Sequence, residues 1–209
     1  MTEFSNHWLY EFVTLLVILD PIATVPLFLS AVAGLERRQS FLVALYAVGL
    51  AFGILLFFIG VGQHLLEAMK IPMSSFQLAG SLIFLILGLR MATGTADSHE
   101  QKNPLPNKLL DRAIYPLATP GIAGGGSILT VVLLTDNNTR SLEEQIITSG
   151  VLLACLCVHL LSFMLSGFIT RWLGIAGVQV ISRVFGLILT SIAVNGIVIA
   201  IKLSFDLGT

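Results

Sequence analysis

The chain has 209 residues, of which 56% are hydrophobic and only 11% are charged, and its formal net charge is -1. Soluble domains carry about 25% charged residues and must present a polar exterior, so an ordinary soluble fold is excluded. The absence of a basic patch gives no reason to expect a nucleic-acid partner. The composition instead indicates a protein whose surroundings are a lipid bilayer.

A helix needs about 20 apolar residues to cross the hydrocarbon core of a bilayer. The chain contains six such stretches, which predicts an all-α membrane protein with six transmembrane helices in a single domain, 1–209. The stretches are Trp8–Ala33, Phe41–Leu66, Met73–Ala92, Ala113–Thr135, Gln145–Thr170 and Val180–Leu203. We expect turns at 34–40, 70–72 and 174–177, and a polar cytoplasmic linker over 93–112. Residues 1–7 contain no Lys or Arg, so no cleavable signal peptide is expected.

The first predicted span is interrupted near its middle. Two prolines stand in the segment Asp20-Pro21-Ile22-Ala23-Thr24-Val25-Pro26. Proline removes a backbone donor and clashes with the preceding helical turn. The segment should therefore open the helix inside the membrane, where the freed backbone groups need partners from protein or from a water-filled cavity.

The fourth predicted span is interrupted in a similar way. Its segment is Pro116-Leu117-Ala118-Thr119-Pro120-Gly121-Ile122-Ala123-Gly124-Gly125-Gly126. The glycine triplet adds conformational freedom to the effect of the prolines. Isolated proline kinks also occur for packing reasons alone, and this second reading stays open at both breaks.

The two interruptions correspond to each other along the chain. Asp20-Pro21 aligns with Thr119-Pro120, and Pro26 then aligns with Gly125. Each interruption opens a group of three spans, and an odd number of spans makes the groups insert in opposite directions. The sequence therefore predicts two inverted three-helix repeats, at about 8–92 and 113–205. Paired broken helices in such repeats mark the substrate site of many secondary transporters.

The basic residues are distributed unevenly between the two sides of the predicted topology. One side carries Arg37, Arg38, Arg90, Lys102, Lys108, Arg112, Arg171 and Arg183, and the other carries Lys70, Arg140 and Lys202. Cytoplasmic loops of membrane proteins are enriched in Lys and Arg. We therefore expect the first side to face the cytoplasm, and both termini to lie outside it.

The two interrupted segments resemble motifs of the MarC family of bacterial and archaeal inner-membrane proteins, which are also described as neutral amino acid transporters. The family pattern Asp-Pro-x-Gly-Asn-x-Pro-x-Phe corresponds here to 20–28, and Pro-Leu-Ala-x-Pro-x-x-Ala-Gly-Pro-Gly corresponds to 116–126. Length, span number and motif positions agree over essentially the whole chain. The resemblance implies a multi-pass protein of the inner membrane that moves small solutes.

The sequence departs from both family patterns. The Gly-Asn pair is replaced by Ala23-Thr24, and the final proline of the second motif is replaced by Gly125. An asparagine amide offers both donors and acceptors, whereas Thr24 offers a single hydroxyl. If the family reads its substrate with that amide, the specificity of this chain differs.

Asp20 is the only carboxylate that we place deep in a span. A charge at the bilayer centre costs at least ~2.5–3.5 kcal/mol, so it needs a partner, a proton or water. One reading is a site for a coupling ion, either a proton or sodium, or for a substrate ammonium group. The other is a helix N-cap, with Pro21 as the first residue of the restarted helix. The two readings are compatible.

The second break offers backbone rather than side chains. A half-helix that starts near Ser127 would present free N–H groups and a positive dipole end, which suit a carboxylate. Asp20 and the exposed carbonyls of the first break would suit an ammonium group, so the pair matches a zwitterionic amino acid. The predicted substrate-binding residues are Asp20, Pro21, Thr24, Pro26, Thr119, Pro120, Gly121, Gly124, Gly125, Gly126, Ser127 and Asn195.

Other polar residues in the spans carry weaker signals. His159 has no second ligand nearby in sequence and is more often a packed, hydrogen-bonded group than a metal site. Asn195 could bond across helices or line a pathway. Cys155 and Cys157 point to nearly opposite sides of a helix, so they should not pair with each other. Gly80, Gly88, Gly186 and Ser191 are expected to allow close approach of helices.

These observations favour a secondary transporter of small, amino-acid-like solutes without a tightly bound cofactor or metal. The chain has no Walker motif, so ATP is not its direct energy source. A channel, or a non-transporting membrane component of a stress response, is the alternative. An intramembrane enzyme is disfavoured because the usual catalytic signatures are missing. Formation of a homo-oligomer stays open.

Overall fold

A computed structural model describes residues 2–94, 108–135 and 141–205, with the side chains of 2–7 and a few in the last helix left aside. All regular elements in these ranges are helical. Most of the predicted linker, 95–107, lies outside them. The helices are α1 (Thr2–Leu19), α2 (Val25–Ala31), α3 (Arg37–Ala68), α4 (Met73–Thr93), α5 (Leu109–Arg112), η2 (Ala113–Ile122), α6 (Gly125–Leu134), α7 (Leu142–Met164) and α8 (Ser166–Ser204).

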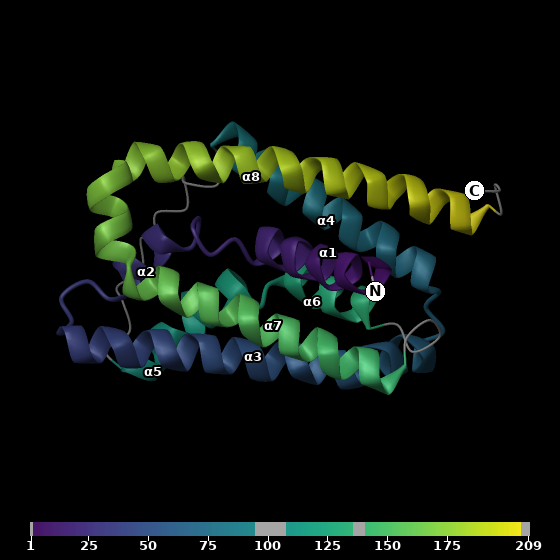
Figure 1. The fold of residues 1–209 in the computed structure, drawn as a ribbon, viewed down its shortest axis with the longest axis horizontal. Coiled ribbons are helices and arrows are strands. Elements are labelled where there is room, and N and C mark those ends of the chain that lie inside the picture. Colours follow the sequence, from purple (N-terminus) through teal and green to yellow (C-terminus); the bar gives the residue numbers. More distant parts are fainter. Residues whose placement is uncertain (1, 95–107, 136–140, 206–209) are drawn as a thin grey trace.

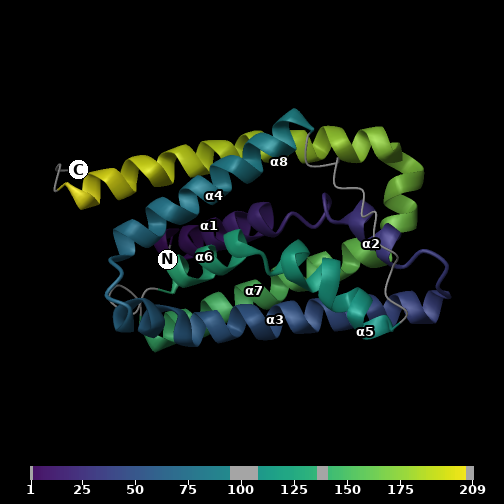
Figure 2. The same ribbon diagram turned by 180° about the vertical axis from the view of Figure 1, so that it is seen from behind.

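The helices run back and forth along one long axis, as Figures 1 and 2 show from opposite sides. α3 and α7 form one side of the bundle, and α4 and α8 form the other. α1 and α6 lie between these two pairs. α1 and α6, which are the helices next to the two breaks, therefore occupy the middle of the bundle.

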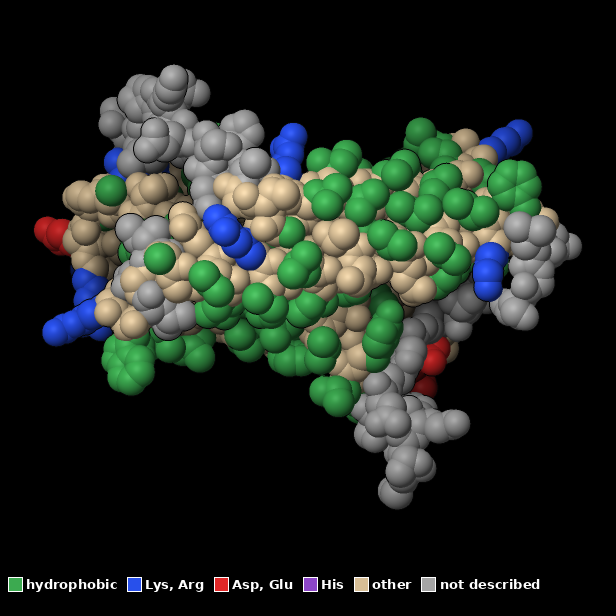
Figure 3. Space-filling model, turned by 90° about the horizontal axis from the view of Figure 1, so that it is seen from above, with side chains coloured by type: hydrophobic (Ala, Val, Ile, Leu, Met, Phe, Trp, Pro, Cys, Tyr) green, Lys and Arg blue, Asp and Glu red, His purple; other side chains and the backbone are tan. Residues whose placement is uncertain are grey.

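The length and hydropathy of the helices identify a multi-pass membrane protein. In the described part of the chain, four helices are long and apolar enough to cross a bilayer: 37–68, 73–93, 142–164 and 179–204. The segments 109–122 and 125–134 act as a fifth crossing if the bent pair, with its angle of 56°, is counted as one span. The helix over 8–19 is apolar but shorter. Figure 3 shows hydrophobic side chains over the central part of one face, with Lys and Arg toward either side.

Two apolar clusters hold the bundle together. The larger one joins α3 to α7, and α3 contributes small residues at helical spacing, Ala44, Ala47 and Ala51. The smaller one contains Phe84 of α4, Leu129 of α6 and Leu189 of α8. α1 belongs to both, because Leu15 and Leu19 pack in the first cluster and Ile18 in the second.

The predicted end of the fifth span was wrong. We expected this span to continue to Thr170, but α7 ends at Met164 and α8 begins at Ser166. The turn predicted at 174–177 agrees with a break in α8 at Gly174, which has a φ of 66° and a ψ of 173°, and the apolar helix that follows covers 179–204. The apolar run continues past the corner, so hydropathy gave no sign of where the helix ends.

The expected close approach of helices is confirmed for α4 and α8. A Cβ built on Gly88 would lie 2.8 Å from the backbone nitrogen of Thr190 and 2.9 Å from the carbonyl oxygen of Gly186. A Cβ on Gly186 would lie 2.5 Å from the backbone nitrogen of Ala92. The backbones of the two helices are therefore in direct contact at these glycines.

Substituting either glycine should separate α4 from α8. Gly88→Ala and Gly186→Ala should each lower the free energy of unfolding by about 1–3 kcal/mol, because rigid backbone must move to admit the methyl group. The measurement is the melting temperature of the purified protein in detergent. Gly60→Ala on α3 is the control, since a Cβ there meets nothing within 4 Å. Equal melting temperatures for all three variants would contradict the packing argument.

Candidate functional site

The first break lies between Leu19 and Val25, where the sequence predicted it. Asp20 has a φ of 40°, in the positive region that aspartate adopts more readily than most other residues. Its Oδ1 accepts a hydrogen bond of 3.1 Å from the backbone nitrogen of Ala23. The Thr24 hydroxyl lies 3.2 Å from the carbonyl oxygen of Pro21. Side chains of the break thus satisfy backbone groups that the helix no longer pairs.

The prediction that Pro21 would start the second half-helix was wrong. Residues 21–24 form a turn, and α2 starts at Val25 with Thr24 at its N-cap. The Asp20 carboxylate still acts as a local cap, because it receives the Ala23 amide. It caps the turn that precedes the helix rather than the helix itself.

His159 of α7 reaches into the first break. Its Nε2 lies 2.9 Å from the Thr24 hydroxyl oxygen, and its ring is fully buried. The ring meets Phe163 edge-on at a centroid distance of 4.8 Å, and Phe163 stacks on Phe28 of α2 at 4.4 Å. This contact joins residues 135 positions apart, and it was not anticipated from the sequence, in which His159 stands alone.

Two buried polar atoms in this cluster have no hydrogen-bond partner among the described residues. They are Oδ2 of Asp20 and Nδ1 of His159. The Thr24 hydroxyl has one proton. If it donates that proton to Pro21, then His159 must donate from Nε2, and Nδ1 remains a bare acceptor. Unpaired polar atoms of this kind are rare in proteins and mark a place where a water, an ion or a proton can bind.

The second break has a different construction. Tyr115 and Thr119 both have extended backbone inside η2, and each precedes a proline, which disfavours helical geometry. Gly124 then caps α6 without a side-chain hydrogen bond. The Ser127 hydroxyl donates to the carbonyl oxygen of Ile122 at 2.6 Å. The half-helix predicted from about Ser127 is confirmed, and it begins two residues earlier.

A cavity of about 300 Å³ opens at the start of α6. Residues of α4 and of the second break line it, together with Ile18 at the end of α1. Its lining residues are Ile18, Ile83, Ile86, Leu87, Arg90, Pro120, Gly121, Gly124, Gly125, Gly126 and Ser127. A Cβ on Gly125 would meet nothing within 4 Å, so the backbone there faces open space.

The predicted site residues fall into separate groups. Six of them line the cavity: Pro120, Gly121, Gly124, Gly125, Gly126 and Ser127. Asp20, Pro21 and Thr24 are buried at the first break, outside the lining. Pro26 is exposed, Thr119 donates to the carbonyl of Ile114, and Asn195 is exposed on α8. The two breaks therefore do not line one shared cavity, because Asp20, Pro21 and Thr24 of the first break are not in its lining.

A second buried carboxylate, Glu11, was not singled out from the sequence. Glu11 on α1 is only 1% exposed, and its Oε2 accepts a hydrogen bond of 3.0 Å from the Thr148 hydroxyl of α7. Its helical spacing from Leu15 and Leu19, which are buried, was the available signal. Arg90 was likewise counted only as a cytoplasmic charge.

Cys155 is buried and Cys157 is exposed, so the two thiols do face different sides of α7 as predicted. The Cys155 thiol lies 3.6 Å from the carbonyl oxygen of Phe12 on α1. No group of three or more His, Cys, Asp or Glu side chains in the described ranges could hold a metal ion.

The contact between Thr24 and His159 should stabilise the fold. Thr24→Val removes the hydroxyl that contacts Nε2 of the fully buried His159 imidazole, so we expect a loss of about 1–3 kcal/mol in unfolding free energy. Thr24→Val combined with His159→Phe should cost less than the sum of the two single changes, as a double-mutant cycle in detergent would measure. Ser30→Ala, at an exposed position of α2, is the control. Strict additivity would rule out the coupling.

Comparison with known proteins places the chain in a family. Residues 5–205 match the family described as MarC family integral membrane protein. A UPF0056 membrane protein of Buchnera aphidicola subsp. Schizaphis graminum is 31% identical, over 99% of this chain and 96% of that protein. One from Aquifex aeolicus is 30% identical, over 97% and 95% of the two chains. The Bacillus subtilis protein YvbG is 27% identical, over 96% of each.

No solved structure matches the chain significantly. The family match covers nearly the whole length, including both broken segments, and the relatives share that length. The chain therefore belongs to the MarC family of integral membrane proteins, as its two proline-containing motifs predicted.

Proposed function

We propose that this protein is a secondary transporter of small solutes, with neutral amino acids or related metabolites as its substrates. The observation that carries the proposal is the cavity of about 300 Å³ at the glycine-rich start of α6. That volume lies at the lower end of the range for small-molecule sites. A broken helix that opens into a cavity is also the common plan of substrate sites in transporters.

The chemistry of the cavity suits a solute with one anionic end and an apolar body. The first N–H groups of a helix have no partner within it, and Gly125, Gly126 and Ser127 present theirs beside the cavity. The Arg90 side chain adds a positive charge to the same lining. Ile83, Ile86 and Leu87 form an apolar wall on α4. A carboxylate would bind at the amides and Arg90, and an aliphatic side chain would face α4.

The ammonium group of an amino acid would bind on the α1 side of the cavity. Ile18 lines the cavity, and Asp20 follows two residues later at the first break. The main-chain carbonyls and the carboxylate of that break are the acceptors closest in sequence to the lining. This assignment makes Asp20 part of the proposed site, together with the cavity residues.

The proposal includes six membrane crossings arranged as two inverted repeats. α1 with α2 would form the first crossing, and η2 with α6 the fourth. Both breaks have a non-helical residue before proline, at Asp20 and Thr119. The second half-helix then starts at Val25 in one and at Gly125 in the other, which agrees to within one residue with the alignment of Pro26 with Gly125. Substrate would reach the cavity from alternate sides as these repeats rock against each other.

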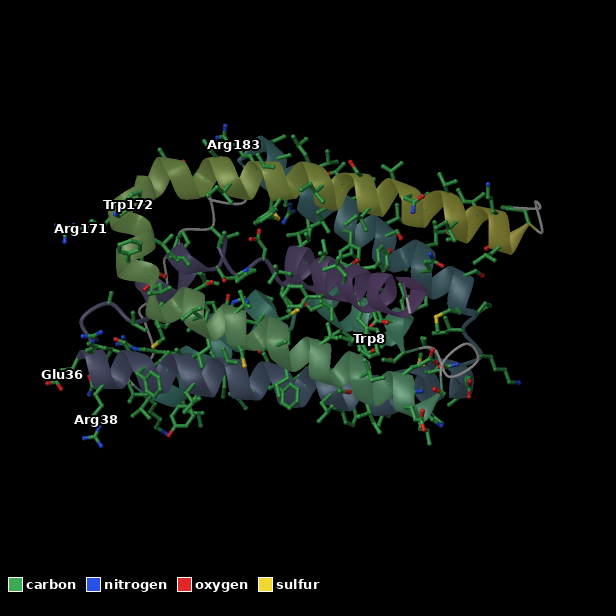
Figure 4. All side chains as sticks on the ribbon, in the orientation of Figure 1. Trp8, Glu36, Arg38, Arg171, Trp172 and Arg183 are labelled. Carbon is green, nitrogen blue, oxygen red and sulfur yellow. The ribbon has the colours of Figure 1, made fainter. Side chains whose placement is uncertain are left out.

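We further propose that the protein lies in the inner membrane with both termini outside the cytoplasm. Figure 4 places Arg38 and Arg171 at one end of the molecule, where the Glu36 label also lies. Arg112 is at the same end, since its guanidinium donates to the carbonyl oxygens of Ala31 and Ala33. Both chain termini lie toward the other end (Figure 1). This segregation supports the positive-inside assignment.

A channel is the second candidate, because the cavity is partly open and lined mainly by apolar groups and backbone. Flux into proteoliposomes separates the two. Concentrative uptake and counterflow favour a transporter, whereas downhill flux that no ion gradient alters favours a channel. An enzyme remains the least supported class, since neither the motifs nor the cavity supply a nucleophile with an adjacent base.

Binding measurements on purified protein test the proposed site. Arg90→Gln should weaken binding of neutral amino acids about tenfold, the equivalent of 1.4 kcal/mol, because a charge-assisted hydrogen bond is lost. Binding of the corresponding amino acid amides should change much less, because they lack the carboxylate. Arg37→Gln, at an exposed position of α3, is the matched control. Equal affinity of wild-type protein for acids, amides and deaminated analogues would remove the zwitterion proposal.

The orientation has a simple test. Green fluorescent protein fused to the C-terminus should stay dark in bacteria, because it does not fold outside the cytoplasm when exported unfolded. Alkaline phosphatase at the same position should be active. A fluorescent C-terminal fusion would reverse the proposed topology.

A further inference from the structure

The chain changes direction twice between α7 and the membrane-crossing part of α8. Leu165 follows the last residue of α7, and its carbonyl oxygen accepts a hydrogen bond of 2.9 Å from the backbone nitrogen of Phe168. A short helix over 166–173 then ends at Gly174, whose φ of 66° and ψ of 173° are not helical. We call residues 166–173 the corner helix. The apolar helix that is long enough to cross a bilayer covers 179–204.

The corner helix lies across one end of the bundle. Figures 1 and 2 show the first part of α8 turned away from the long axis along which the other long helices run. At 1.5 Å per residue the corner helix is roughly 12 Å long. It is therefore too short to cross a hydrocarbon core of about 30 Å. When the long helices cross a bilayer, the corner helix lies along the membrane surface.

The corner helix carries a pair of exposed aromatic side chains. Phe168 and Trp172 are four residues apart, so they share one side of the helix. Their ring centroids are 5.9 Å apart, and the ring planes are tilted by 31°. Phe168 is 60% exposed and Trp172 is 77% exposed, so the two rings pack on each other more than on the bundle. Aromatic side chains in such positions are typical of the membrane–water interface, where the indole N–H can reach the headgroups.

An exposed arginine accompanies the aromatic pair. Arg171 precedes Trp172, and Figure 4 places both at the end of the molecule that also carries Arg38. Residues 145–205 contain no Asp or Glu. Neither α8 nor α7 beyond Glu144 can therefore offer the Arg171 guanidinium a carboxylate partner. Its charge is available to an anion outside the protein.

The neighbouring elements make this end of the molecule basic. The start of α3 and the short helix α5 both lie there. Among the described residues, their charged side chains, with those directly before them, are Glu36, Arg37, Arg38, Lys108, Asp111 and Arg112. The basic residues of this set outnumber the acidic ones by four to two before Arg171 is added. The field at this end therefore favours anions.

We propose that the corner helix is an interfacial helix that binds anionic phospholipids of the surrounding bilayer. The Arg171 guanidinium contacts the lipid phosphate, which matches its planar set of donors, and Phe168 with Trp172 lies among the first carbons of the acyl chains. An anionic headgroup leaves that phosphate charge uncompensated, whereas a zwitterionic headgroup carries its own ammonium group. This lipid site goes beyond the proposed transport function and does not depend on it.

The size and charge of the corner helix favour lipid over a protein partner. A specific protein interface buries about 1,000 Å² or more, which is larger than one exposed side of a two-turn helix. A second copy of this chain that met the corner helix with its own would bring two Arg171 charges together. Anionic lipid instead offers charge complementarity, and its acyl chains cover the aromatic pair.

Fluorescence quenching tests the depth of the corner helix in vesicles of phosphatidylcholine and phosphatidylglycerol. The chain has two tryptophans, so Trp8→Phe leaves Trp172 as the only one. Lipids brominated near the headgroup end of the acyl chain should quench Trp172 more strongly than lipids brominated near the terminal methyl group. Stronger quenching from the terminal positions, or weak quenching from both, would overturn the interfacial placement. Weak quenching from both is the result expected if another protein chain covers the aromatic pair.

The choice of headgroup tests the contact of Arg171. In vesicles with equal amounts of the two lipids, bromine on phosphatidylglycerol should quench Trp172 more than bromine on phosphatidylcholine. We expect a preference of about fivefold, the equivalent of roughly 1 kcal/mol for one basic residue at an anionic surface. Arg171→Gln should abolish this preference, and Lys202→Gln, at an exposed position near the other end of α8, should leave it intact. Equal quenching by both lipids, or a preference that survives Arg171→Gln, would overturn the proposal.

Native mass spectrometry of the full-length protein gives a second measurement, with Trp8 left in place. Phosphatidylglycerol adducts should outlast phosphatidylcholine adducts on the wild-type protein. Arg171→Gln should reduce the phosphatidylglycerol adducts, whereas Lys202→Gln should not. Equal retention of the two lipids, or the same reduction in both variants, would contradict a site at the corner helix.

Discussion

Unpaired backbone groups inside a bilayer must find partners within the protein, and the rest of this structure depends on how the two breaks meet that requirement. At the first break, the Asp20 carboxylate and the Thr24 hydroxyl take the place of the missing helical bonds. At the second, the amide of Ala123 reaches back to the carbonyl of Ala118, and Ser127 bonds to Ile122. Because these local groups form hydrogen bonds with the backbone of the two breaks, the breaks can lie within the helix bundle. The start of α6, at Gly125, Gly126 and Ser127, lines a cavity.

The fold follows closely from the sequence because membrane insertion imposes strong and simple rules. Runs of about 20 apolar residues mark crossings, and proline with glycine marks the places where a crossing is broken. Both breaks and most helix ends were therefore predictable. The α7–α8 corner was not, because Leu165 and Phe168 are as apolar as the helix interior. Hydropathy records what is compatible with lipid, and it does not record where a helix turns.

The candidate site was predictable only in part, for a different reason. The glycines of the second break were found because backbone access has a local signature in sequence. The contacts of Glu11 with Thr148 and of Thr24 with His159 join residues more than 130 positions apart. No spacing rule within one helix indicates such pairs. Asn195 lies at an exposed position of α8 and not in the lining of the cavity, because a polar residue in a span can also face outward.

The glycine contact between α4 and α8 has a mechanical consequence. With backbones touching at Gly88 and Gly186, there is no layer of long side chains between the two helices to slide or re-pack. We therefore expect α4 and α8 to move together as one rigid body. Within this pair, α4 contributes apolar residues and Arg90 to the lining of the cavity. The second break contributes the glycines, Pro120 and Ser127. A tilt of the α4–α8 pair relative to the second break would therefore change the width of the cavity.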